Sequence, residues 1–301
     1  MAILYRSTIS QPEPLLEYLL ASLGLKRKIV KDLLKYGAVA VNGKSTTQYD
    51  HPLRPGDQLT VCDLRTAVAT GHLEYARIRL VFEDEALLVV DKPPGLLTVA
   101  TEREKLDTLY VHLNDFLQNR DLARVERALV VHRLDQDTSG LVLFAKNEQV
   151  KRQLQEAWPS VEKTYWAVVE GKPAAATGTV DNYLVESGKS FKVFSSRRET
   201  PDSKRAITHY RLLESQDELS LVEIRLQTGR KHQIRVHLAD LGCPVVGDKR
   251  YGATTTDALN RLALHAAKLS FAHPVTREPL NFSLPLPKAF ARLFPGSAGR
   301  N

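Results

Sequence analysis

The chain has 301 residues, 43% of them hydrophobic, which is enough for one large domain or for a medium domain with a small one, and composition excludes neither. Lysine and arginine number 42 against 35 acidic residues, and the net charge of +7 suits a polyanionic partner as well as it suits a mildly basic cytosolic protein. Cys62 and Cys243 match no metal-ligand spacing, which argues against a zinc site or a disulfide framework. The apolar runs have strand length and the N-terminus lacks a signal-peptide core, so we expect a soluble, cytoplasmic protein.

Residues 12–63 are predicted to form a small module of two helices and a hairpin. Leucines recur at helical spacing from Leu15 to Leu23, and Gly24 is expected to stop that helix. A second helix is expected over 26–36, with lysine and arginine on most of its polar positions. The first part of the chain is therefore predicted to be a basic α/β module.

A tight hairpin is indicated by Asn42-Gly43, a pair suited to a turn with positive φ. The stretch 33–44 (LLKYGAVAVNGK) resembles the S4-type RNA-binding domain. That resemblance implies RNA binding, with Lys28 and Lys31 of the second helix as phosphate contacts; the alternative is a solvated charged face. Residues 64–79 are polar and are interpreted as a linker.

From residue 80 to 295, short apolar runs of strand length alternate with turns and helical stretches. This mixing predicts an α+β domain with a mixed, mainly antiparallel sheet flanked by helices. Helices are expected near residues 107–117, 148–157, 233–241 and 258–267. The polar, basic stretch 186–211 fits either a loop that touches phosphates or a hairpin with solvated charges.

The segment 131–140 (VHRLDQDTSG) is a polar loop between two apolar runs, where a rigid scaffold tends to present reactive groups. It contains two carboxylates, Asp135 and Asp137, next to basic side chains. From residue types alone, such an aspartate is a nucleophile, a base or a member of a structural ion pair.

The run HRLD-x-x-TSG in this loop is similar to the signature of the RluA family of pseudouridine synthases. Further segments resemble family motifs in order: 91–96 (DKPPGL), 163–171 (KTYWAVVEG), 226–237 (LQTGRKHQIRVH), 247–252 (GDKRYG) and 262–266 (LALHA). The resemblance covers residues 80–290 and implies an isomerase that flips a uridine out of structured RNA and rejoins its uracil to the ribose through carbon 5. It implies no cofactor and no metal.

The resemblance also implies a catalytic set. Asp135 is the carboxylate that attacks ribose carbon 1′ or removes a proton from carbon 2′, and the sequence does not choose between these routes. Arg230 is its ion-pair partner, which keeps the carboxylate charged despite burial. Tyr165 stacks on the flipped uracil, unless it is a core residue of its strand. Asp137 is expected to accept hydrogen bonds within its own loop.

A second set is expected to bind the RNA. Arg133 fills the space that the base leaves, and Ile234 forms an apolar wall beside the ring or a part of the core. His132 and Lys163 are also expected to bind RNA. The histidines of these motifs are expected to orient loops or to contact phosphate.

Two other classes of protein are compatible with parts of this sequence. One is an RNA-binding protein that keeps the fold and lacks catalysis; the presence of Asp135, Arg230 and Tyr165 argues against it. The other is a metal-dependent nuclease using the histidines, but their spacing does not match a metal site. We expect a monomer acting on ribosomal RNA in preference to transfer RNA.

Overall fold

The computed structural model describes residues 3–35, 37–62, 73, 76–120, 126–188, 192–255, 259–294 and 296. The chain divides into two compact units, Met1–Arg79 with Leu109–Ala128, and Leu80–Thr108 with Leu129–Asn301. Within the described ranges, no helix combines the length and the apolarity needed to cross a membrane.

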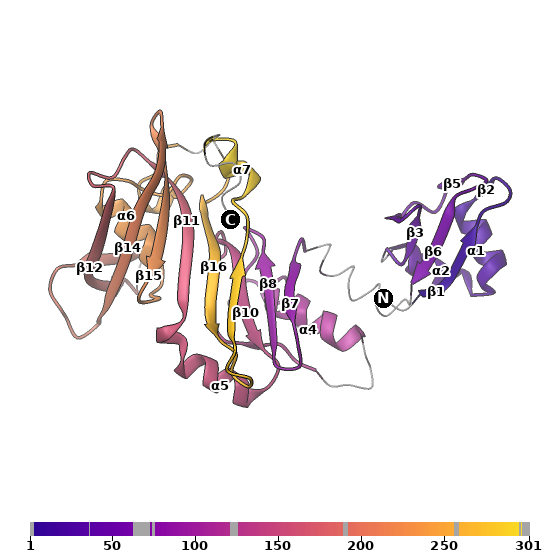
Figure 1. The fold of residues 1–301 in the computed structure, drawn as a ribbon, viewed down its shortest axis with the longest axis horizontal. Helices are drawn as coiled ribbons and strands as arrows, with labels where there is room; N and C mark the ends of the chain where they lie inside the picture. The colour runs from indigo at the N-terminus through magenta and orange to yellow at the C-terminus, as the bar shows by residue number, and fades with distance from the viewer. Residues whose placement is uncertain are drawn as a thin grey trace. The chain divides into compact units, whose positions relative to one another are not determined.

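The N-terminal unit contains a four-stranded sheet in the order β1-β6-β3-β4, with every pair antiparallel (Figure 1). Its helices are α1 (Leu15–Leu23) and α2 (Arg27–Lys35), and α4 (Leu109–Arg120) groups with it. The strands are β1 (Ile3–Thr8), β3 (Val39–Val41), β4 (Lys44–Ser45) and β6 (Gln58–Cys62), with a separate pair formed by β2 (Glu13–Pro14) and β5 (Pro52–Leu53).

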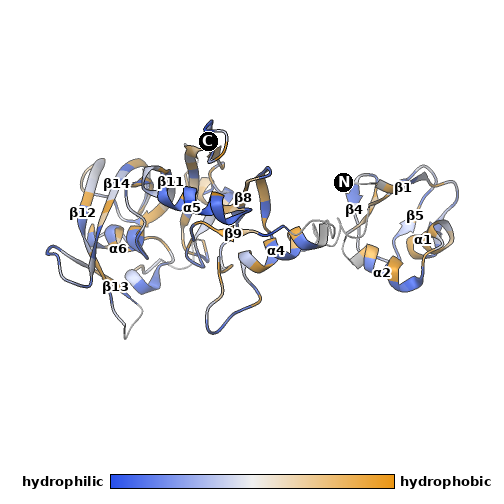
Figure 2. Ribbon diagram, turned by 90° about the horizontal axis from the view of Figure 1, so that it is seen from below, coloured by the Kyte–Doolittle hydropathy of each residue, from blue (hydrophilic) through white to orange (hydrophobic). Residues whose placement is uncertain are grey.

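Local signals in the sequence explain this small unit. Gly24 ends α1 with φ 61°, and Asn42-Gly43 turns the hairpin with φ 54° and 77°, conformations that glycine and asparagine adopt most easily. Leu15, Leu16 and Leu19 of α1 and Val30, Leu33 and Leu34 of α2 are buried in one cluster with Val39 and Val61 of the sheet, whereas Ile29 is exposed. In Figure 2 the ribbon of α2 carries both hydrophobic and hydrophilic colours, as expected for a helix with one buried face.

The first break between the units, at Arg79 and Leu80, falls where the catalytic domain was expected to begin. The linker predicted over 64–79 lies mostly outside the described residues. The grouping of Leu109–Ala128 with the N-terminal unit was not predicted from the sequence. The two domain assignments therefore stay predictions.

The larger unit is built on one sheet in the order β13-β12-β14-β15-β11-β16-β10-β8-β7, with β17 paired to β16 and β9 to β10 (Figure 1). β10 and β16 are parallel, whereas β10 is antiparallel to β8 and β9, and the pairs from β11 to β17 are antiparallel. Few helices accompany the sheet, so the predicted α+β class with a mixed, mainly antiparallel sheet is confirmed. The strands are β7 (Arg79–Glu83), β8 (Leu87–Lys92), β9 (Leu129–Val130), β10 (Ser139–Ala145), β11 (Glu162–Glu170), β12 (Thr177–Glu186), β13 (Val193–Ser196), β14 (Ser203–Gln216), β15 (Leu219–Leu226), β16 (Leu264–Ala272) and β17 (Pro279–Ser283).

The helices of this unit are α5 (Glu148–Glu156), α6 (Gln233–Asp240) and α7 (Lys288–Ala291), with short 3-10 turns at Trp158–Ser160 and Lys249–Tyr251. The strand β10 is buried along its whole length, which accounts for its unbroken apolar run. At the start of β10, Gly140 has φ 113°, and a Cβ there would stand 2.2 Å from the carbonyl oxygen of Ala266 on β16. Only glycine allows the two backbones to approach so closely.

One predicted helix is wrong. The stretch 258–267 was expected to be helical, but Leu264–Ala272 forms β16, which pairs with β10, β11 and β17 (residues 256–258 are not described). A short apolar run fits a buried strand as well as a helix. Here the pairing of this run with β10 on one edge and β11 on the other makes it a strand. The described parts of 186–211 lie largely in strands β13 and β14, which pair with opposite sides of β12 and not with each other, so the stretch is neither one loop nor one hairpin.

Candidate active site

The loop that joins β9 to β10 presents Asp135 at the edge of a pocket that opens to solvent. The pocket holds about 460 Å³ of empty space, open solvent at its mouth included, and its walls come from the Asp135 loop, from β11 and from the segment that leads into α6. They combine apolar and aromatic surface with a few charged groups, as is typical of a ligand site. The lining residues are Arg133, Leu134, Asp135, Thr138, Tyr165, Leu226, Gly229, Arg230, His232, Gln233, Ile234, Arg235 and Leu264.

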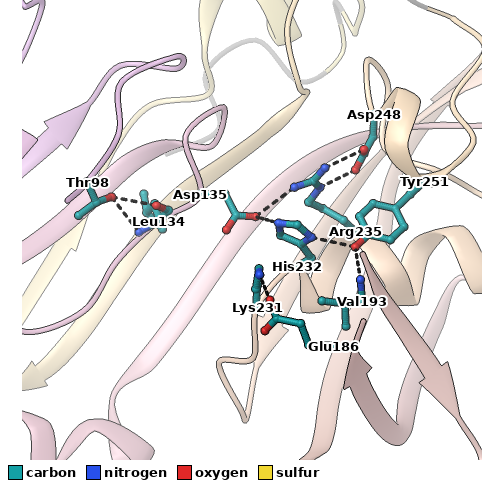
Figure 3. A network of polar contacts seen from close by, with 10 residues as sticks. All are labelled: Thr98, Leu134, Asp135, Glu186, Val193, Lys231, His232, Arg235, Asp248 and Tyr251. Atoms are coloured by element: carbon teal, nitrogen blue, oxygen red, sulfur yellow. Dashed lines mark hydrogen bonds and ion pairs between the residues drawn. The ribbon is translucent and has the colours of Figure 1, made fainter. Parts of the chain in front are cut away.

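Asp135 is paired with an arginine that a second aspartate holds in place (Figure 3). Nη1 of Arg235 lies 3.3 Å from Oδ2 of Asp135. Its Nε and Nη2 donate to the two carboxylate oxygens of Asp248 at 2.6 and 2.8 Å. Burial alone would lower the pKa of Arg235, but its hydrogen bonds to Asp248 and the charges of Asp248 and Asp135 raise that pKa above its usual value. Arg235 is therefore a permanent cation at the carboxylate.

The arginine predicted to hold Asp135 was Arg230, and the structure corrects this assignment. Arg230 lines the same pocket, but its Nε donates to the backbone carbonyl of Arg205 at 3.1 Å. Arg230 precedes α6, whereas Arg235 lies within it, on the helix face turned toward Asp135. Both arginines belong to the run 226–237, so the prediction was right about the motif and wrong about the member of it that pairs with Asp135.

The buried Lys92 connects the Asp135 loop to the segment 93–96 by hydrogen bonds. Its Nζ donates to the carbonyl oxygens of Pro93, Leu96 and Gln136 at 3.0, 2.7 and 2.8 Å. Burial lowers the pKa of Lys92 to about 7, while the charges of Asp137 and Asp135 oppose that change. Three acceptors require three N–H donors, which only the ammonium form has. We conclude that Lys92 is charged and fixes the backbone beside Asp135.

Thr98 holds the same loop from another side. Its hydroxyl donates to the carbonyl of Leu134 at 2.8 Å and accepts from the amide of Leu134 at 3.2 Å (Figure 3). The sequence interpretation missed Thr98, Lys92 and Arg235 as positioning groups. Lys92 belongs to the motif 91–96, so the sequence did contain a signal for it. Thr98 carries no local signal, because its partner Leu134 is 36 positions away.

Three of the predicted substrate contacts do meet at the pocket. Tyr165 on β11, Ile234 on α6 and the exposed Arg133 all line it, together with Asp135. Burial, and then the charge of Asp135, raises the pKa of Tyr165, so its hydroxyl stays protonated. Ile234 is only 5% exposed and also packs into the core, so both roles considered for it are compatible with its place.

The other two predicted RNA contacts, His132 and Lys163, make hydrogen bonds within the protein. Nε2 of His132 accepts the amide of Leu143 at 3.0 Å, and its ring stacks on Trp158. Nζ of Lys163 donates to the carbonyl of Trp158 at 3.0 Å, and the residue is buried. Burial, aided by the charge of Lys163, lowers the pKa of His132 to about 3. Both contacts are structural, and RNA binding by His132 and Lys163 stays a prediction.

His232, between Gly229 and α6, faces Asp135 from the side opposite the loop. Its Nε2 lies 3.8 Å from Oδ2 of Asp135, and its Nδ1 lies 2.8 Å from the hydroxyl of Tyr251. The residue has φ 54°, an unusual backbone conformation for histidine, which aims the ring at the pocket. Across the described ranges, no three histidine, cysteine, aspartate or glutamate side chains gather as a group able to hold a metal ion.

Fold and pocket together define a class of protein: an enzyme whose aspartate, held by a partly buried arginine, faces a pocket with an aromatic wall. Residues 86–240 match the family model described as RNA pseudouridylate synthase. The chain therefore belongs to the RNA pseudouridine synthases, of the RluA type, and is an isomerase.

Relatives of this family cover nearly the whole chain. An uncharacterised RNA pseudouridine synthase of Bacillus subtilis, YlyB, is 37% identical over 273 residues, 89% of this chain and 88% of the relative. Ribosomal large subunit pseudouridine synthase D of Xanthomonas campestris is 35% identical over 282 residues, 89% of this chain and 83% of the relative. Among solved structures, Human RNA Pseudouridylate Synthase Domain Containing 4 is similar with a TM-score of 0.60 and 28% identity, over 76% of this chain and 96% of that one.

Proposed function

We propose that this enzyme converts specific uridines of ribosomal RNA to pseudouridine, with Asp135 as the reacting carboxylate. The observation that carries the proposal is the pairing of Asp135 with Arg235 at the mouth of an open pocket that has an aromatic wall. Among the described residues, Oδ1 of Asp135 makes no hydrogen bond, so one carboxylate oxygen is available to the substrate while the other is held.

The chemistry needs an ionised carboxylate and no added group. The bond between N1 of uracil and C1′ of ribose breaks, the base turns, and a bond forms between C5 and C1′. The hydrogen of C5 is released to solvent and N1 gains a proton, so atoms balance. Whether Asp135 attacks C1′ or removes a proton from C2′, it acts as a carboxylate, and the cation of Arg235, 3.3 Å from its Oδ2, orients it.

A base inside a stem must leave its stack to reach Asp135, which costs a few kcal/mol. Tyr165 offers a ring on which the flipped uracil stacks, a contact worth about 1–3 kcal/mol. Arg133 is exposed at the rim of the pocket, where its guanidinium can enter the space left in the RNA. Ile234 closes the apolar side of the pocket.

Two observations favour ribosomal RNA over transfer RNA as the target. One relative, 35% identical over most of the chain, bears the name ribosomal large subunit pseudouridine synthase D. The other is the N-terminal unit, which we propose to be an S4-like RNA-binding domain, because Lys28 and Lys31 on α2 are exposed while the apolar face of that helix is buried. Such a unit and its substrate belong in the cytoplasm, and we propose that the enzyme acts there as a monomer.

The test has two parts. Pseudouridines are mapped in total RNA with and without the gene, and we expect one or a few ribosomal sites to vanish. In vitro, the full chain is incubated with transcribed ribosomal or transfer RNA carrying tritium at C5 of uridine, and tritium release reports turnover. Release from transfer RNA alone would overturn the ribosomal target. RNA binding without release from either RNA would favour the non-catalytic alternative.

A further inference from the structure

The hydroxyl of Tyr251 connects the rim of the site to its centre. It accepts the backbone N–H of Val193, on β13, at 3.0 Å. It lies 2.8 Å from Nδ1 of His232, and His232 faces Asp135 (Figure 3). The guanidinium carbon of Arg235 lies 5.0 Å from the centre of the same tyrosine ring. One side chain thus contacts both groups that approach Asp135.

Counting protons along this chain of contacts selects one form of His232. A phenol has one proton to donate, and the Val193 amide already occupies an acceptor site of the oxygen. The described residues offer the phenol proton no other acceptor than Nδ1 of His232. A neutral imidazole has one donor and one acceptor nitrogen, so if Nδ1 accepts, Nε2 carries the proton.

The electrostatic setting supports a neutral ring. Burial lowers the pKa of His232 to about 4, against the opposing charge of Asp135 and with the help of Arg235. Nε2 points at Oδ2 of Asp135 from 3.8 Å, the same oxygen that Arg235 approaches to 3.3 Å. That separation exceeds a hydrogen bond, and contacts of this kind commonly tighten when substrate is present.

We propose that Tyr251 is a positioning residue that fixes His232 as an N–H donor toward Asp135. His232 and Arg235 together hold Oδ2, which leaves Oδ1 directed at the nucleoside. Because the imidazole is neutral, it orients the carboxylate without adding a second full charge that would blunt its reactivity. The proposal rests on Asp135 being the reacting group, as proposed above.

The protonation of His232 is measured independently of activity. In full-length protein labelled with ¹⁵N-histidine, long-range proton–nitrogen correlations distinguish the two neutral forms of each ring, and His232→Gln identifies the signal. We expect the Nε2–H form in the wild-type protein and a partial shift to Nδ1–H in Tyr251→Phe. A wild-type His232 that is protonated on Nδ1, or doubly protonated at pH 7, overturns the proposal whatever the enzyme's substrate.

The kinetic consequence is read in single-turnover tritium release from the same labelled RNA. We expect His232→Leu to slow the step by about 10- to 100-fold, with RNA affinity changed less than about 2-fold, because the carboxylate then has one N–H donor fewer. His232→Gln retains an N–H of similar reach and is expected to recover most of that rate. Tyr251→Phe should slow the step by several-fold.

Matched controls separate positioning from general damage. His209, which is exposed, and Tyr183, which is half-buried, belong to the same sheet and are bonded to Thr179 and Glu199. His209→Leu and Tyr183→Phe therefore remove equivalent groups elsewhere, and both should keep the wild-type rate.

Two outcomes would contradict the positioning role. If His232→Leu stays within 2-fold of wild type, or if glutamine at position 232 is no better than leucine, the proposal is wrong. A wild-type enzyme that releases no tritium would instead refute the proposed function and leave the tautomer result standing.

Discussion

The Asp135 loop and the helix α2 are both polar and both proposed to meet RNA, yet they are built in opposite ways. Asp135 is held through Arg235, and its loop through Lys92 and Thr98, by contacts from a helix, a strand and a loop far apart in the chain. On α2, Lys28 and Lys31 are exposed side chains with no ion pair in the described part of the chain. The first region fixes the position of one carboxylate, whereas the second presents charge to the solvent.

The difference reflects what each task requires. A reacting carboxylate must stand at one position to within a fraction of an ångström, so its neighbours are buried and shared. A phosphate contact depends on charge more than on position, so exposed lysines suffice and salt weakens them. Changes in the first region should therefore alter the rate or the fold steeply, and changes in the second should alter affinity by degrees.

The largest expected effect is that of Asp135→Asn. It removes the charge but keeps the shape, so we expect tritium release to fall at least about 10⁴-fold while RNA affinity stays within a few-fold. The control is Asp137→Asn in the same loop, expected to change the rate only a few-fold. Equal losses in both variants would dissolve the distinction between a held carboxylate and an ordinary one.

Lys92→Met tests whether Lys92 stabilises the Asp135 loop through its hydrogen bonds. The substitution leaves the carbonyls of Pro93, Leu96 and Gln136 without their donor, and we expect the free energy of unfolding to fall by roughly 3 kcal/mol or more. Lys163→Met, a buried lysine with one carbonyl partner, should cost about 1 kcal/mol. Urea unfolding measures both, and similar losses would argue against the shared anchor.

Arg235→Lys sharpens the choice between the two arginines of the motif. A lysine keeps the charge but cannot bond both oxygens of Asp248 and also reach Asp135, so we expect about a 100-fold lower single-turnover rate. Arg230→Lys should lower that rate by less than about 5-fold. The reverse ranking would restore Arg230 as the partner of Asp135.

The charged surface is tested by reversing two of its charges. We expect Lys28→Glu with Lys31→Glu to weaken RNA affinity by about 10-fold. The dependence of log affinity on log salt should flatten by about 0.7–0.9 for each phosphate that the variant no longer neutralises. Lys172→Glu with Lys288→Glu changes the net charge equally from two exposed positions in the other unit. If both pairs give the same salt dependence, α2 contributes only net charge.

A gradual effect, spread over two pH units, concerns acid stability. The folded pKa of His132 is about 3, below its ordinary value near 6.5, so the unfolded chain binds a proton that the folded chain does not. The contribution of the neutral His132 to the free energy of unfolding is therefore fully present above pH 6.5 and is lost as the pH falls toward 3. We expect His132→Gln to reduce the slope of unfolding free energy between pH 6 and pH 4 by about 1.4 kcal/mol per pH unit. An unchanged slope in urea titrations would show that folding leaves the pKa of His132 at its ordinary value.

The sequence predicted well wherever the signal was local. Gly24, Asn42-Gly43 and the helix over 233–241 all follow from spacing and turn chemistry, and the ordered motifs identified the family. It failed where distant contacts decide. The helix expected at 258–267 became β16 because β10 and β11 pair with it, and the partner of Asp135 depends on which face of α6 meets the loop.

Gly140 gives the site a property that no side chain of the pocket supplies. Because its backbone almost touches that of Ala266, the gap between β10 and β16 is set by atoms that every residue shares and that no rotamer can adjust. Asp135, a few residues upstream, inherits its location from that gap. A single methyl group at position 140 would push the strands apart and displace the carboxylate without touching any residue of the pocket.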